Sequence, residues 1–386
     1  MYGLRGWGYA GALCALFGVA AAAPLAEPAG FSPARLDRIV DSAVARGFSG
    51  HVLVGAIPPA GASASAGPEV LYERVVGLAD RARNRPIRAD AAWRWASVTK
   101  QVTAALVMQQ VDSGRIALDE PVTRYLPEFG GPTGREVTVR QLLQHTSGLP
   151  NPDDTPRDGD GFPAFYLARG AGTGNAAASR GYCATAPKRA PGAGFEYNNC
   201  DYLVLGAILE RVTGRPYAEL VRGNVARPLG LRSLRVADAP RERSPVIGYE
   251  ADGRREPAMN LATFGAAGAL SGTARDLLAF DHSLAGHRVV SAASTAEMWR
   301  GEPWLGYAAL GAWSFPATLR GCPEPVRLVE RRGAIGGIQV RNVIAPERGR
   351  ALIVFTNSAA VDFGEIWQGK GLSHELLSAA LCAERE

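Results

Sequence analysis

The chain has 386 residues, of which 47% are hydrophobic and 20% are charged, and its formal net charge is +5. This length allows a large buried core in two packed lobes, and the composition is that of a globular protein rather than a disordered one. The weak charge and the absence of a basic run argue against a nucleic-acid partner. We therefore expect a small-molecule or peptide substrate, and the sequence makes no prediction of oligomeric state.

The first residues have the pattern of a secretory signal. Arg5 precedes an apolar stretch over 8–19, and small residues follow at 20–23. The apolar stretch is shorter than the roughly 20 residues that span a membrane, which argues against a stable membrane anchor. We expect a cleaved signal peptide at 1–23 and a periplasmic or secreted protein.

Cysteine usage agrees with export. Beyond the signal, four cysteines remain, and an even count in an exported chain predicts two disulfides. Three pairings are possible, and the local one, Cys183–Cys200 with Cys322–Cys382, is the one we expect; four reduced, buried thiols are the alternative. The cysteines form no close pairs and the histidines no helical zinc motif, so we expect no metal. No glycine loop for a nucleotide occurs, and we expect no cofactor.

The elements follow in chain order from residue 32. Ser32 and Pro33 are typical of a helix start, and Leu36 to Ala43 repeats at helical spacing. Strands over 51–56 and 70–77 are predicted to form an antiparallel hairpin. The later predicted helices cover 98–113, 139–145, 201–213, 217–225, 273–285 and 363–382. The later predicted strands cover 306–313, 327–331, 338–344 and 351–357.

This order predicts an α/β (α+β) fold with one antiparallel sheet built from both chain ends and flanked by helices. The α/β domain would comprise 32–110 and 250–386, and the helical middle at 111–249 would be a second, inserted domain. The segment from Asn151 to Gly194 is rich in Gly, Ala, Pro and Asp. A loop of this length in a compact domain indicates a functional rim or a flexible insert.

The first chemical signal is Ser97-Val98-Thr99-Lys100 at the start of a predicted helix. A spacing of three places both side chains on one helical face, where a neutral lysine can accept the serine proton. The alternative is a serine that caps the helix beside a solvent-facing lysine. Only three of the 42 Lys and Arg residues are lysines. Because arginine does not deprotonate in a protein, a rare lysine at this position favours a role as base.

Two weaker signals follow. In Tyr197-Asn198-Asn199 the phenol can share a proton with a lysine, although a buried tyrosine before a helix cap would look the same. In Arg331-Arg332-Gly333-Ala334, at the end of a predicted strand, the glycine would let a substrate backbone lie against the strand edge. A strand that leads into a glycine turn is the plainer interpretation.

Together the motifs Ser-x-x-Lys, Tyr-x-Asn and a late basic-x-Gly, in this order, resemble the serine β-lactamase and penicillin-binding superfamily. The similarity is greatest to the branch of class C β-lactamases, D-alanyl-D-alanine carboxypeptidases, D-aminopeptidases and β-lactamase-like esterases. It extends from about residue 32 to the C-terminus. Further matching stretches are ASVTKQVTAALVMQQVDSGRIALDEPV, LLQHTSGLP, FEYNNCDYLVLGAILERVTGRPY and AAGALSGTARDLLAF.

The resemblance implies a β-lactamase/transpeptidase-like fold with the site between the two lobes. It implies that Ser97 is the nucleophile, with Lys100 and Tyr197 as the proton-transfer pair. Asn199 would be a positioning group, and the N–H groups of Ser97 and Ala334 would form an oxyanion hole. The implied activity is that of a serine hydrolase that acts on a D-amino-acid peptide, a β-lactam or a small ester.

One residue departs from the family pattern, because Arg331 stands where lysine or histidine is usual. Strand alternation puts Arg331 and Gly333 on one face and Arg332 on the other. A permanent cation can bind a substrate carboxylate but cannot relay protons, which weakens the expectation of efficient β-lactam hydrolysis. His145, within QHTSGLP, is expected to be structural.

Two other classes compete with this hydrolase. One is a penicillin-binding sensor that acylates Ser97 or holds a ligand without useful turnover. The other is a serine hydrolase with a nucleophile elbow, and the absence of Gly-x-Ser-x-Gly argues against it.

Overall fold

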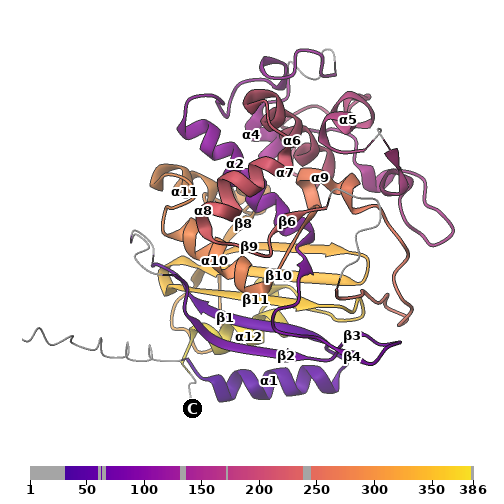
Figure 1. Ribbon diagram of the computed structural model, residues 1–386. Coiled ribbons are helices and arrows are strands. Elements are labelled where there is room, and N and C mark those ends of the chain that lie inside the picture. Colours follow the sequence, from indigo (N-terminus) through magenta and orange to yellow (C-terminus); the bar gives the residue numbers. More distant parts are fainter. Residues whose placement is uncertain are drawn as a thin grey trace, which may run out of the picture.

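The computed structural model describes residues 31–59, 62, 67–130, 136–170, 173–237 and 245–383 (Figure 1). The predicted signal peptide at 1–23 lies outside the described residues. The described part combines one large antiparallel sheet with many short helices, as the sequence predicts.

The sheet has six strands in the order β2-β1-β11-β10-β9-β8. Its N-terminal hairpin, β1 and β2, joins the C-terminal strands because β1 pairs antiparallel with β11. The prediction of one sheet made from both chain ends is therefore confirmed. The bounds are β1 Gly50–Ala56, β2 Val70–Val76, β8 Trp313–Ala317, β9 Val326–Ile335, β10 Ile338–Ala345 and β11 Arg350–Thr356.

The predicted strand over 306–313 is wrong, because the edge strand β8 begins only at Trp313. Gly306, Tyr307 and Gly311 have φ angles of 62°, 64° and 86°, which break an extended backbone. The predicted C-terminal helix also begins too early. Gly369 and Gly371 have φ angles of 68° and 90°, and α12 starts after them at Leu372.

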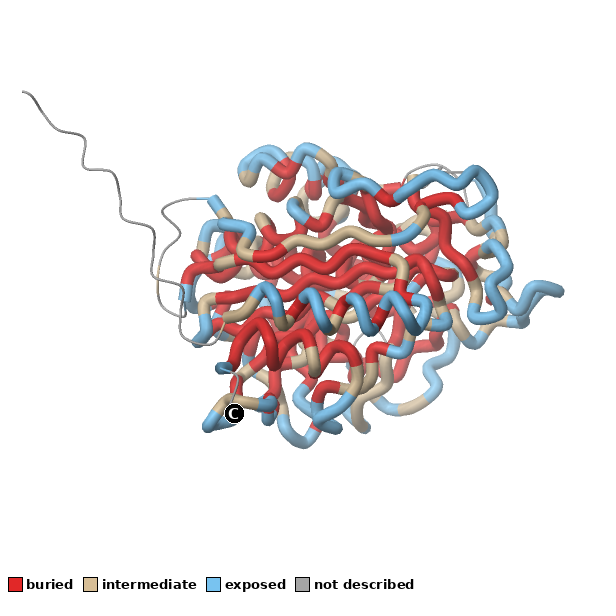
Figure 2. Tube along the Cα trace, turned by 90° about the horizontal axis from the view of Figure 1, so that it is seen from below, coloured by how far each residue is buried: buried red, intermediate tan, exposed pale blue. Residues whose placement is uncertain are grey.

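Each face of the sheet covers its own hydrophobic core. Helices α1 (Pro33–Ala45) and α12 (Leu372–Leu381) lie below the sheet. Their apolar side chains form one core with the residues on the lower face of the sheet, such as Val52 and Val354. Helices α2 (Thr99–Asp112) and α10 (Ala274–Ala285) lie above it and pack against residues such as Leu53 and Ile353. Seen from below, the strands form a buried centre bordered by exposed turns (Figure 2).

The remaining helices gather above the sheet, away from α1 and α12 (Figure 1). The predicted helix over 217–225 is divided into α7 and a π-helical turn, Val221–Ala226. The predicted domain boundaries at residues 110 and 250 stay a prediction. These elements are α4 Val139–Leu143, α5 Asn175–Arg180, α6 Asn199–Thr213, α7 Tyr217–Leu220, α8 Arg227–Leu229, α9 Gly265–Gly268 and α11 Ala292–Met298. Short strands complete the fold: β3 Leu78–Asp80, β4 Arg85–Pro86, β5 Trp93–Arg94, β6 Arg235–Val236 and β7 Leu270–Gly272.

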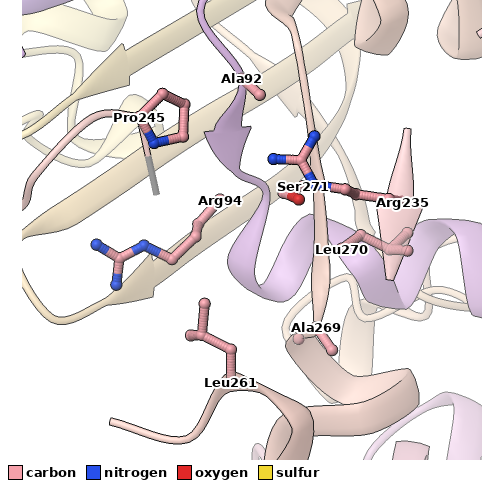
Figure 3. A pocket seen from close by; sticks show the side chains of 9 residues that line it. Ala92, Arg94, Arg235, Pro245, Leu261, Ala269, Leu270 and Ser271 are labelled. Carbon is pink, nitrogen blue, oxygen red and sulfur yellow. The ribbon is translucent and has the colours of Figure 1, made fainter. Parts of the chain in front are cut away.

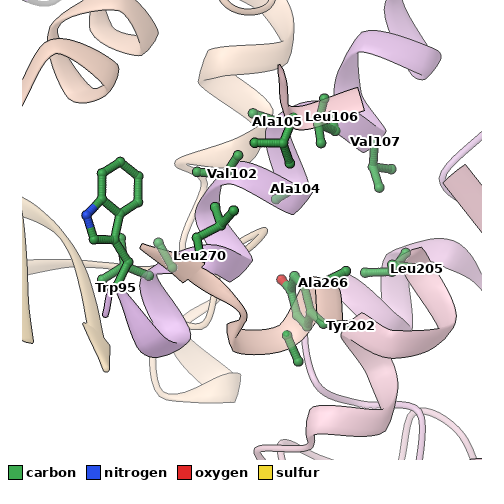
Figure 4. Close-up of a cluster of buried hydrophobic side chains, with 14 of the residues drawn as sticks. Trp95, Val102, Ala104, Ala105, Leu106, Val107, Tyr202, Leu205, Ala266 and Leu270 are labelled. Carbon is green, nitrogen blue, oxygen red and sulfur yellow. The ribbon is translucent and has the colours of Figure 1, made fainter. Parts of the chain in front are cut away.

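Helix α2 is buried almost all round, since 11 of its 14 residues are inaccessible to solvent. It packs between the sheet side and helices α6 and α9, with Val102, Ala104 and Leu106 in one cluster with Tyr202 and Ala266 (Figure 4). A helix that is buried on nearly every side is held in place by the elements packed around it. The first turn of α2 is therefore held rigidly, which matters for the residues it carries.

Two disulfides form, with the expected pairing Cys183–Cys200 and Cys322–Cys382. The first connects the irregular 151–194 segment to the start of α6. The second connects the turn between β8 and β9 to the end of α12. Within the described ranges, no helix is long and apolar enough to cross a membrane. The same ranges contain no group of three or more His, Cys, Asp or Glu side chains that could hold a metal ion.

Candidate active site

Ser97 lies in a tight turn between β5 and α2. The turn is a 3-10 helix, Ala96–Val98, and Ala96 adopts a φ of 46°, which is uncommon for a residue with a side chain. Ser97 is half-buried, whereas its neighbours Ala96 and Val98 are fully buried. The helix predicted over 98–113 forms as α2. Ser97 lies just before this helix and is partly exposed to solvent.

Three predicted site residues meet at the serine hydroxyl. The Tyr197 hydroxyl lies 2.5 Å from Ser97 Oγ, and Lys100 Nζ lies 3.3 Å from the same atom. Tyr197 comes from the residues just before α6, a hundred positions along the chain. The interpretation of Lys100 as a solvent-facing residue is wrong, because it is fully buried.

The surroundings of Lys100 favour a neutral amine. Burial lowers the pKa of Lys100 well below its usual value, and the nearby charge of Arg331 lowers it further. Nζ donates to Asn199 Oδ1 at 2.6 Å and to the Ala267 carbonyl at 2.8 Å. Ser97 Oγ is the third neighbour of Nζ, at 3.3 Å, so an amine that has lost its proton can direct a lone pair at this hydroxyl.

Arg331 supports the serine and the tyrosine from β9. Its Nε donates to the Ser97 carbonyl at 2.9 Å and its Nη2 donates to the Tyr197 hydroxyl at 3.0 Å. Burial raises the pKa of Tyr197, whereas the Arg331 charge and the bond to Ser97 act in the opposite direction. The guanidinium also lies between the rings of Tyr197 and Trp313, at 5.2 and 5.0 Å from their centres. Arg332 points away from the serine and pairs with Glu330.

Gly333 allows β9 to lie directly against the serine turn. A Cβ at this position would lie 2.8 Å from Ser97 N and 2.9 Å from Trp95 O, closer than real Cβ contacts. The strand does not end at Arg331 as the sequence suggested, but continues to Ile335. Ala334, the next residue, is exposed. Its N–H as an oxyanion donor stays a prediction.

Asn199 is the first residue of α6 and does not cap it. The cap is Asn198, whose Oδ1 accepts from Cys200 N at 2.7 Å. The Asn199 side chain is thus free to connect two groups. Its oxygen accepts from Lys100, and its Nδ2 donates to the Tyr166 hydroxyl at 2.8 Å.

His145 packs behind the tyrosine. Its ring centre lies 4.7 Å from that of Tyr197, and Nδ1 lies 2.9 Å from Asp201 Oδ2. Burial lowers the pKa of His145 and raises that of Asp201, so the pair favours its uncharged form beside Lys100. The histidine makes no contact with Ser97 in this arrangement, in agreement with the expected structural role.

The sequence motifs do not indicate Asp153 and Tyr166, which both come from the irregular segment before α5. The Tyr166 hydroxyl donates to Asp153 Oδ1 at 2.6 Å, and Asn199 Nδ2 lies 3.3 Å from Asp153 Oδ2. The available signal was a pair of acidic residues soon after QHTSGLP, in a segment already expected to form a rim.

A separate small pocket is lined by residues that include Arg94, Leu261 and Ser271, and Ser97 is not among its lining residues (Figure 3). Its volume of about 10 Å³ has room for about one water molecule and is too small for a substrate. The Arg94 guanidinium pairs there with Glu256.

Comparison with known proteins agrees with this geometry. The Beta-lactamase family model matches residues 36–371. The chain belongs to the Beta-lactamase family. The family that the sequence motifs indicate is thus confirmed.

Relatives in this family differ in activity. The esterase EstB of Burkholderia gladioli is 39% identical over 244 residues, which cover 58% of this chain and 56% of EstB. The D-alanyl-D-alanine-carboxypeptidase/endopeptidase AmpH of Escherichia coli (strain K12) is 28% identical, with 60% of this chain and 57% of AmpH covered. The matched part thus spans less than two thirds of either relative. A crystal structure of D-amino acid amidase from Ochrobactrum anthropi SV3 superposes with a TM-score of 0.71 at 26% identity, over 90% of this chain and 97% of the amidase.

Proposed function

We propose that this protein is an exported serine hydrolase that forms an acyl intermediate on Ser97 and releases the acyl group to water. The observation that carries the proposal is the buried Lys100, whose Nζ lies 3.3 Å from Ser97 Oγ while the Tyr197 hydroxyl contacts the same oxygen. Relatives named as an esterase, a carboxypeptidase and a D-amino acid amidase support hydrolysis of an acyl bond. The substrate would be a D-amino-acid peptide, a β-lactam or a small ester.

The proposed proton route follows from the contacts. Ser97 Oγ attacks the substrate carbonyl as its proton moves to the neutral Lys100 amine. Tyr197, which stays protonated when buried, gives its proton to the leaving group and regains one from the lysine. The carbon–heteroatom bond breaks and the acyl-serine remains. Water then attacks the acyl carbon, the same groups take its proton, and Ser97 leaves as the hydroxyl.

In this route the charge of Arg331 would act on both Lys100 and Tyr197. It cannot exchange protons, but its charge disfavours a protonated Lys100 and favours negative charge on the Tyr197 oxygen. The predicted oxyanion hole would be formed by the N–H groups of Ser97 and Ala334. Gly333 supports this prediction because it brings the β9 backbone against the serine turn.

Export is the other part of the proposal. Two disulfides favour an oxidising compartment, where such bonds persist. The apolar N-terminal stretch that predicts a signal peptide supports the same location.

Intact-mass measurement after exposure to penicillin, a D-Ala-D-Ala peptide and a short p-nitrophenyl ester tests the proposal. We expect an acyl adduct on the wild type that decays with product release, and neither adduct nor product with Ser97→Ala. An adduct that never decays would instead identify a penicillin-binding sensor. Hydrolysis that persists in Ser97→Ala would disprove the assignment of the nucleophile.

A further inference from the structure

Asp153 is held beside the segment that carries Tyr197 and Asn199 by the side chain of Asn151. Asn151 Nδ2 donates to the Tyr197 carbonyl at 3.1 Å, and its Oδ1 accepts from Asn199 N and from Asp153 N, each at 3.3 Å. Asn151 itself is buried. One side chain thus fixes the turn that carries Asp153 to the segment that carries the catalytic tyrosine, although the turn lies in an otherwise irregular region.

The Asp153 carboxylate has only neutral donors. Tyr166 donates to Oδ1 at 2.6 Å, and Asn199 Nδ2 lies 3.4 and 3.3 Å from the two oxygens. Burial raises the pKa of Tyr166 well above its usual value, so this phenol stays a donor. Among the described residues no cation lies within ion-pair distance of Asp153. The side chain is half-buried and therefore open to a ligand.

The adjacent residue provides a contrast. Asp154 is exposed and pairs with Lys188 at 2.6 Å, as an ordinary surface carboxylate does. Asp153 instead faces the site, and its charge acts on both Lys100 and Tyr197. Burial favours the neutral form of Lys100. Among the described residues, Asp153 thus lies near the base without an ion-pair partner of its own.

A short chain of hydrogen bonds connects Asp153 to Lys100. Asn199 binds Lys100 through Oδ1 and reaches Asp153 through Nδ2, so a single amide group separates the base from the carboxylate. An amino group on the carbon next to a scissile carbonyl lies within about two bonds of the atom that Ser97 attacks. A carboxylate that is one amide group away from the base is therefore a candidate partner for such a group.

We propose that Asp153 is a specificity-determining residue that binds the ammonium group of an α-amino acyl substrate, such as an amino acid amide or a peptide with a free amino terminus. This inference rests on the proposed acyl-serine function. A charged hydrogen bond to an ammonium group holds the adjacent carbonyl in position at Ser97. The rival role is that of a base that activates the deacylating water.

Matched substrates separate the two roles. D-alanine p-nitroanilide carries the ammonium group, and N-acetyl-D-alanine p-nitroanilide lacks it. We expect wild-type protein to prefer the free amine, and Asp153→Asn to lose about ten- to a hundredfold in kcat/KM on it, chiefly through KM. The N-acetyl substrate should lose little. Asp154→Asn, the matched control, should change neither. Equal losses on both substrates in Asp153→Asn, chiefly in kcat, would establish the rival role and overturn the proposal.

A second readout does not need turnover. A fluorophosphonate labels an active serine, and D-alanine amide should slow the labelling of wild-type protein more than N-acetyl-D-alanine amide does. Asp153→Asn should lose this difference between the two amides, when each protected rate is compared with the variant's own unprotected labelling rate. Labelling of wild-type protein without protection by either amide, or with protection by the acetylated amide alone, would disprove the ammonium site. The acyl-serine function would stand in either case. Absence of labelling together with absence of hydrolysis would disprove the proposed function itself.

Discussion

The two sides of Asn199 show how one site holds two ionisable groups in different surroundings. On the interior side, Lys100 is fully buried among α2, α6 and α9 and is favoured in the neutral form. On the rim side, Asp153 is half-buried in a short turn that Asn151 holds in place. Dense packing favours the neutral form of the amine, whereas partial exposure leaves the carboxylate within reach of a ligand. We infer that the interior side performs the chemistry and the rim side selects the substrate.

The largest effect should come from the interior side. Lys100→Arg and Lys100→Ala should each reduce kcat/KM by about a hundred- to ten-thousandfold, because neither residue can accept the serine proton. Kinetics on any substrate that the wild type hydrolyses give the measurement, with Lys188→Arg as the surface control. If Lys100→Arg kept most activity, lysine would act only through its charge.

The pH profile of the wild type tests the same residue. Since activity requires neutral Lys100, kcat/KM should fall as the pH drops below the lowered pKa of Lys100 and stay high above it. A profile that rises toward acid pH would contradict a neutral base.

Arg331 offers an intermediate test. Loss of a charge-assisted hydrogen bond of about 1.5–3 kcal/mol corresponds to roughly ten- to more than a hundredfold in kcat/KM. If Arg331 binds a substrate carboxylate, Arg331→Ala should lose this much on carboxylate substrates and far less on neutral esters. Because the guanidinium also holds Ser97 and Tyr197, equal losses on both substrate classes would show that it only supports them. Arg332 pairs with Glu330 and Glu365, so Arg332→Ala should leave kcat/KM unchanged on both substrate classes.

Asp281 is a second buried ionisable group near α2, and we expect it to affect stability rather than hydrolysis. It accepts hydrogen bonds from Gln101 and Asn342, and burial raises its pKa to about 8. Between about pH 4 and pH 8 the folded form keeps a proton that the unfolded form has lost, so the free energy of unfolding falls as the pH rises, by up to about 1.4 kcal/mol per unit.

Asp281→Asn removes this dependence. Thermal unfolding at pH 5 and pH 8 should therefore show a melting-temperature gain for the variant that is greater at pH 8, with hydrolysis unchanged. A gain of the same size at both pH values would show that Asp281 is ionised in the folded protein.

The sequence by itself determined the family, the sheet built from both chain ends and the expectation of two disulfides, whereas the choice among three pairings needed the fold. The first three follow from local information: hydrophobic spacing, turn residues, an even cysteine count and motifs such as Ser97-x-x-Lys100. The two misplaced elements, at 306–313 and 363–371, contain glycines whose positive φ angles are not evident from hydrophobic spacing alone.

Only the tertiary structure decided the state of the site. The neutral form of Lys100 depends on burial by three helices and on the charge of Arg331, more than two hundred residues away in the chain. The place of Asp153 beside Asn199 depends on hydrogen bonds made by Asn151 to residues 46 and 48 positions further along. Charge state and proximity arise from packing between segments distant in sequence, and no local pattern records them.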